Sequence, residues 1–189
     1  MTRPPDEVLQ RAQAFVREEA GFAQVVTLDR HGYPVGRSAT AILRPDWSVA
    51  LVHRRSHARL AQVRRDPRVL VTWVGSPAPG ASNENPHVFD VGHLPARVVL
   101  VRGTAVLADD AWTEEVYRRA LEEQRAAGHT KAPVRDAAQV RADLVGLHVT
   151  PYRVRLEGFG EGAESSDWVQ GPSLSSGPQQ DNNSNGGDR

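Results

Sequence analysis

The chain of 189 residues contains no cysteine. This absence excludes disulfides, thiolate metal sites and cysteine nucleophiles. The chain has a single lysine, Lys131, so arginine carries almost all of the positive charge. Because 23 basic and 23 acidic residues give a formal net charge of zero, the composition disfavours a general nucleic-acid binder and predicts no nucleic-acid partner. Any anion that this chain binds has to be held by a local cluster.

Long apolar segments are also missing. The first 15 residues lack the apolar core of a signal peptide, and no later segment approaches the roughly 20 apolar residues that span a bilayer. These absences predict a cytoplasmic protein without a membrane partner.

Several catalytic motifs are absent as well. Ser38 and Ser56 lie outside any G-x-S-x-G elbow, which disfavours a hydrolase triad, and neither a G-x-G-x-x-G segment nor a P-loop occurs. His53 and His57 are four residues apart, but the glutamate of the H-E-x-x-H pattern is missing and His53 falls in a predicted strand. A metal site is therefore disfavoured.

Apolar periodicity predicts a mainly β protein with flanking helices. A barrel of six antiparallel strands would remove exposed sheet edges, and Gly103 marks a bulge where the sheet curls. The predicted helices begin near Asp6, at an N-cap on Ser56 and at Asp109, and the six predicted strands are 22–28, 35–42, 48–53, 68–74, 96–107 and 144–159.

Composition divides the chain in two. Residues 1–160 carry the periodic apolar pattern of one domain with an N-terminal helix. Residues 161–189 are rich in Ser, Gly, Gln, Asn and Asp, which cannot offset the entropy of ordering, so we expect a disordered polar tail.

Arginines gather around the predicted start of the second helix. Arg54, Arg55 and Arg59 flank Ser56. Helix N-termini offer unpaired backbone N–H groups, and guanidinium forks match phosphate oxygens, so the cluster predicts a phosphate site. The alternative is a surface helix with solvated arginines.

The preceding strand carries small and polar residues: Arg37, Ser38, Ala39 and Thr40. Such residues allow a flat ring to approach the backbone, and the arginine can reach a ring carbonyl or a phosphate. An ordinary half-exposed strand is the alternative for this segment alone.

The order of these elements resembles a known family, the FMN-binding split β-barrel proteins related to pyridoxamine 5'-phosphate oxidase. The resemblance covers roughly residues 10–158. Four segments carry it: GYPVGRSATAI, SHARLAQVRRDPRVLVTW, RVVLVRGTAVL and VTPYRVRLEGFG. It implies a six-stranded antiparallel split β-barrel and a homodimer that holds its cofactor at the interface.

The resemblance also implies site residues. The first cofactor strand of the family falls on Arg37 to Ile42, and a pair at the end of the third strand falls on His53 and Arg54. The family's phosphate-binding lysine falls on Arg59, whereas its neighbouring arginine falls on Ala58. Together with the arginine cluster, the resemblance implies cofactor contacts at Arg37–Thr40, at His53–Ser56 and at Arg59.

The implied function is a flavin-dependent oxidoreductase that acts on a small molecule, with FMN as cofactor. Subfamilies use a deazaflavin coenzyme, and others bind haem, which is the least favoured of the three. A non-catalytic protein that sequesters or senses flavin or haem is the competing hypothesis, because no catalytic acid or base stands out.

Overall fold

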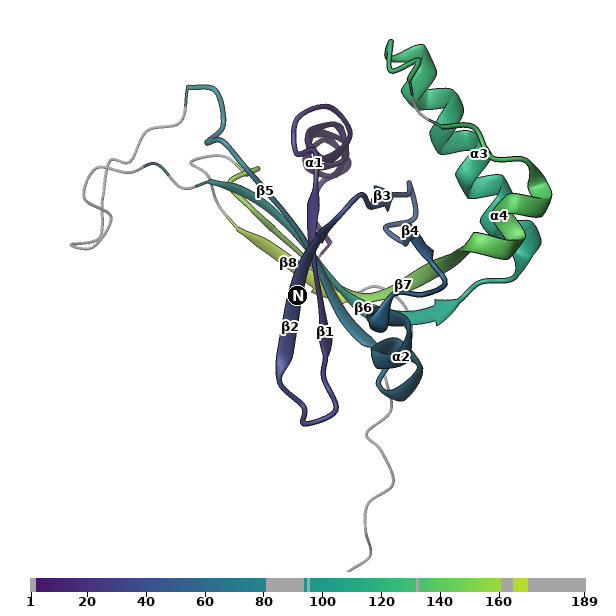
Figure 1. Cartoon of the computed structure of the whole chain (residues 1–189). Helices are drawn as coiled ribbons and strands as arrows, with labels where there is room; N and C mark the ends of the chain where they lie inside the picture. Colours follow the sequence, from purple (N-terminus) through teal and green to yellow (C-terminus); the bar gives the residue numbers. More distant parts are fainter. Residues whose placement is uncertain (1–2, 81–93, 95, 132, 161–164, 170–189) are drawn as a thin grey trace, which may run out of the picture.

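The computed structural model describes residues 3–80, 94, 96–131, 133–160 and 165–169. These residues form an eight-stranded sheet with helices around it (Figure 1). In chain order the elements are α1 (Asp6–Glu18), β1 (Ala23–Leu28), β2 (Pro34–Ala39), β3 (Ile42–Leu43), β4 (Val49–Arg54), α2 (Ala58–Arg65), β5 (Arg68–Gly75), β6 (Arg97–Leu107), α3 (Asp110–Ala126), α4 (Ala137–Asp143), β7 (Leu144–Glu157) and β8 (Ser166–Val169).

The sheet curls into a half-barrel. Its strand order is β2-β1-β5-β6-β7-β4-β3, and every pairing is antiparallel. β2 and β3 stand at opposite ends of this order, yet only Thr40 and Ala41 separate them in the chain. The two ends of the sheet are therefore joined covalently, which requires the sheet to curl. The predicted mainly β, antiparallel split-barrel class is confirmed.

Two strands are additional to the predicted six. The predicted strand 35–42 divides into β2 and β3, because residues up to Ala39 pair with β1 whereas Ile42 and Leu43 pair with β4. A single stretch of chain thus serves two distant parts of one sheet. The second addition is β8, which pairs with β7.

Strand β8 lies within the predicted disordered tail. Trp168 is 3% exposed, and its ring packs edge-on against Trp47 at 5.3 Å between centroids. Asp167 accepts hydrogen bonds from the Arg153 guanidinium. The expectation of disorder does not hold for these four residues, because distant partners stabilise them. Residues 161–164 and 170–189 of the predicted tail lie outside the described residues.

The predicted bulge at Gly103 is present. The register between β6 and β7 shifts between Arg102 and Gly103, so that Gly103 faces Pro151 and Tyr152 is the extra residue. A Cβ atom at Gly103 would collide with the backbone carbonyl oxygen of Thr150. Glycine is therefore required for the close approach of the two strands.

The helices cover different parts of the half-barrel. α1 contacts β3, α2 contacts β1 and β6, and α3 and α4 lie together beside β4 and β7 (Figure 1). The helix predicted to begin at Asp109 is α3, and Asp109 caps it, since its side chain accepts a hydrogen bond from Trp112 N. Within the described part of the chain, none of the helices is both long and apolar enough to cross a membrane.

The predicted cap of α2 is wrong. The backbone N–H of His57 donates to the Arg54 carbonyl, so residues 54–57 form a turn that contains Ser56. The helix begins after His57, whose backbone is extended and whose side chain makes no capping hydrogen bond. The first turn of α2 therefore lacks a side-chain cap.

Candidate functional site

A cleft of about 640 Å³ lies between β2 and the start of α2. Its walls come from segments about 20 residues apart in the chain, which the curled sheet brings together. The lining residues are Arg37, Ser38, Ser56, His57, Ala58 and Arg59. Among the described residues that line this cleft there is no carboxylate, and two are arginines.

Arg59 forms the buried end of the cleft. It is 6% exposed although it carries a guanidinium. Among the described residues its recorded hydrogen-bond partner is the His53 ring, and no carboxylate forms an ion pair with it. Burial lowers the pKa of Arg59, and the positive charge of Arg37 lowers it further. A buried cation without an anionic partner is costly, so this end of the cleft favours a bound anion.

The facing wall is formed by β2. Arg37 and Ser38 are exposed on this edge strand. The side-chain amide of Gln24, on β1, donates to the Ser38 hydroxyl oxygen at 2.7 Å, which fixes the position of that hydroxyl. The O–H group of Ser38 is then available as a donor to a ligand. Arg37 and Ser38 thus supply one cationic and one neutral donor.

The start of α2 adds backbone donors. Ala58 and Arg59 lie in the first turn, where backbone N–H groups have no acceptor within the helix. Because α2 lacks a side-chain cap, its N-terminus offers these groups and a partial positive charge to a ligand. The arrangement can therefore bind a phosphate from the helix end, from Arg59 and from β2.

Several of the predicted site residues do not line this cleft. Arg55 is turned away: its guanidinium donates to Asp110 at 2.5 Å and to the Arg141 carbonyl at 2.8 Å. These contacts tie the turn after β4 to α3 and α4. Arg54 is exposed at the end of β4, and Ala39 is half-buried.

His53 lies beneath the cleft rather than in its wall. It is 6% exposed, and burial lowers its pKa to about 4, with the charges of Arg59 and His57 acting in the same direction. The rings of His53 and His57 are 5.8 Å apart. No group of three His, Asp or Glu side chains with metal-binding geometry occurs among the residues that the structure describes.

His57 and Ala58 also line the cleft, although the sequence did not indicate them as site residues. The turn at residues 54–57 shifts the helix start from Ser56 to these two residues, so recognising this turn would have identified them. The contribution of Gln24 could not have been found, since it depends on the register between β1 and β2.

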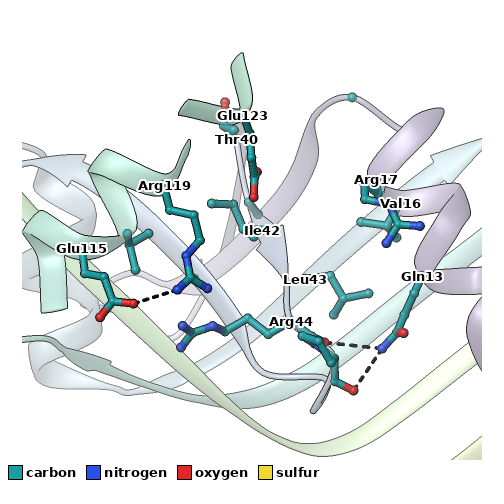
Figure 2. A pocket seen from close by; sticks show the side chains of 15 residues that line it. Gln13, Val16, Arg17, Thr40, Ile42, Leu43, Arg44, Glu115, Arg119 and Glu123 are labelled. Carbon is teal, nitrogen blue, oxygen red and sulfur yellow. Dashed lines mark hydrogen bonds and ion pairs between the residues drawn. The ribbon is translucent and has the colours of Figure 1, made fainter. Parts of the chain in front are cut away.

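A second cavity, of about 380 Å³, adjoins the continuation of the same chain segment. Thr40, a predicted cofactor contact, lines this cavity instead of the cleft, together with Ile42. Figure 2 shows that α1, the β3–β4 turn and α3 enclose it, with Arg44 and Arg119 projecting from different walls. The Arg119 guanidinium is paired with Glu115 at 3.0 Å, and Gln13 donates to the Arg44 and Pro45 carbonyls. The cavity is lined by both apolar and charged residues.

The curled antiparallel sheet and the arginine-lined cleft define a split-barrel protein with a candidate anion site. Residues 8–158 match the family model described as pyridoxamine 5'-phosphate oxidase. The chain belongs to this family. No curated protein matches the chain.

Solved structures share this fold. A haem-binding protein from Mycobacterium smegmatis is 19% identical with a TM-score of 0.56, over 90% of this chain and 60% of that protein. A Clostridium acetobutylicum protein related to general stress protein 26 of B. subtilis, of the pyridoxinephosphate oxidase family, is 14% identical with a TM-score of 0.56, over 88% and 96% of the two chains. An F420 reductase is 15% identical with a TM-score of 0.50, over 75% and 94%. At these identities the likeness establishes the fold alone.

Proposed function

We propose that the chain binds a phosphorylated flavin-type cofactor, with the cofactor phosphate in the cleft between β2 and α2. The observation that carries this proposal is Arg59, a buried guanidinium that faces the cleft without a carboxylate partner in the described chain. FMN is the primary candidate, because the pyridoxamine 5'-phosphate oxidase family commonly binds flavin. Of the residues expected to contact the cofactor, Arg37, Ser38, Ser56 and Arg59 support the proposal by lining the cleft.

The ring of the cofactor would extend from this cleft along β2, towards Ala39 and Thr40. We place the small-molecule substrate in the cavity beside Ile42, because that cavity adjoins the next residues of the same segment. There the cofactor would supply the hydride or electron transfer, and this chain would position it. The same proposal includes a homodimer, in which a second copy of the chain would complete the cofactor site.

Two readouts test this function. Purified protein should show flavin-like absorbance, or should bind FMN or a deazaflavin coenzyme on titration, and mass analysis of the material released on denaturation identifies which one. Binding of riboflavin should be weaker than binding of FMN, because riboflavin lacks the phosphate. A protein that binds none of these compounds contradicts the proposal.

Turnover is tested separately. A bound flavin that is reduced by a nicotinamide donor, or a bound deazaflavin that is reoxidised by a substrate, supports an oxidoreductase. A cofactor that remains oxidised with every donor supports the competing hypothesis of a sequestering or sensing protein.

A further inference from the structure

The contact between His53 and Arg59 is unusual for a buried arginine. His53 lies on β4, opposite Val145 of β7, and Arg59 lies in the first turn of α2. Both side chains are 6% exposed, and 3.3 Å separates Nη1 of Arg59 from Nε2 of His53. Buried arginines are ordinarily paired with carboxylates.

The chemistry of arginine fixes the direction of this hydrogen bond. A guanidinium has only donors, so Nε2 of His53 has to accept. An imidazole whose Nε2 accepts carries its proton on Nδ1 and is neutral. Burial and the neighbouring charges, which lower the pKa of His53 to about 4, are consistent with a neutral ring.

We propose that His53 is a positioning residue: as the neutral Nδ1–H tautomer, it orients the Arg59 guanidinium towards the cleft without cancelling its charge. A carboxylate at this position would orient the guanidinium equally well, but it would neutralise the cation. The neutral ring occupies Nη1 and leaves the other N–H groups of Arg59 for an anion. The identity of that anion as a cofactor phosphate rests on the proposed function.

The surroundings of this pair agree with the assignment. The charged and titratable groups that act on it are Arg37, across the cleft, and His57, whose ring is tilted against His53. Both are basic. In the described residues, therefore, no acidic group is recorded as acting on Arg59 in competition with a ligand, and protonation of His53 would place a further positive charge beside it.

A binding experiment with matched variants tests the role. His53→Leu removes the acceptor and His53→Gln restores one, while His129→Leu, at an exposed position after α3, is the control. We expect His53→Leu to weaken FMN binding about tenfold and to leave riboflavin binding unchanged, because one charge-assisted contact becomes poorly oriented. His53→Gln should recover most of the FMN affinity. If His53→Leu weakens the binding of FMN and of riboflavin equally, His53 has a structural role and the proposal is wrong.

Nitrogen-15 NMR of the histidine side chains tests the tautomer without a ligand. The expected spectrum shows a neutral His53 ring with its proton on Nδ1 from pH 5 to pH 9. A proton on Nε2, or a charged ring at pH 7, overturns the inference even if His53→Leu does not fold. If the wild-type protein binds neither FMN nor riboflavin while NMR gives the Nδ1–H tautomer, the proposed function fails but the positioning contact stands.

Discussion

Replacement of Arg59 by methionine should weaken ligand binding without destabilising the free protein. Methionine keeps the length and most of the apolar contacts of the side chain, but removes its charge. Arg59 is 6% exposed and has no anionic partner among the described residues. In the free protein the substitution therefore removes the cost of burying an unpaired charge, partly offset by the lost contact with His53. We expect the free variant to melt at the same temperature as wild type or above it.

The effect on FMN should be large. A hydrogen bond to a charged group contributes about 1.5–3 kcal/mol, which corresponds to a loss of affinity of about 10-fold to 150-fold. Riboflavin lacks the phosphate, so its affinity should change by less than about twofold, since no charged contact is involved. The ratio of the two affinities isolates the phosphate contact from general effects on the fold.

Thermal unfolding with and without FMN measures both effects in one assay. At a free FMN concentration of 100 times the wild-type Kd, ligand binding stabilises the wild type by about 2.7 kcal/mol. If the variant binds about 50-fold more weakly, the same concentration stabilises it by only about 0.6 kcal/mol. Arg64→Met, on an exposed position of the same helix, is the control and should behave as wild type. A variant that is destabilised when free but keeps its FMN affinity would refute the reasoning and make Arg59 a structural residue.

Three further substitutions test the fold. Gly103→Ala should lower the free energy of unfolding in urea by about 1–3 kcal/mol, because the new methyl group meets the Thr150 carbonyl oxygen. An unchanged midpoint of urea unfolding would contradict the close approach of β6 and β7. The Arg68 guanidinium lowers the pKa of Asp66 from 3.8 to about 2, so the stability that Asp66 contributes is complete above pH 4 and is lost as the pH falls to 2. The difference in free energy of unfolding between wild type and Asp66→Asn should therefore disappear over that window. A difference that stays constant with pH would exclude the contact with Arg68 as its cause. Trp168→Ala should lower the free energy of unfolding by about 3–5 kcal/mol if β8 is part of the core, whereas a loss below about 1 kcal/mol would mean that β8 is dispensable.

The sequence predicts most of the sheet, because strand formation depends on local alternation and turn residues. The bulge at Gly103 and the helix start at Asp109 were predicted for the same reason: each depends on one residue and its immediate neighbours. The division of 35–42 into β2 and β3 was not found, since it depends on which strands pair with each half. β8 was missed because Trp168 is stabilised by a residue 121 positions earlier, Trp47.

The candidate site likewise has features that the sequence predicts locally and features that depend on distant residues. The sequence places arginines near a helix start and near an edge strand, and the structure brings Arg37 and Arg59 to one cleft. The sequence could not show that Arg55 forms hydrogen bonds with α3 and α4, because those partners lie 55 and 86 residues away. Nor could it show that Arg59 is buried without an acid. Charge can be read locally, whereas the pairing of charges depends on the tertiary structure.

The central claim is that Arg59 and the start of α2 hold a cofactor phosphate. The most direct test is a crystal structure of the protein with FMN. We predict phosphate oxygens about 2.7–2.9 Å from the Arg59 guanidinium nitrogens, with the backbone N–H groups at the start of α2 donating to the same phosphate. An FMN phosphate bound elsewhere, with Arg59 still hydrogen-bonded to His53 and not to the phosphate, would contradict this prediction.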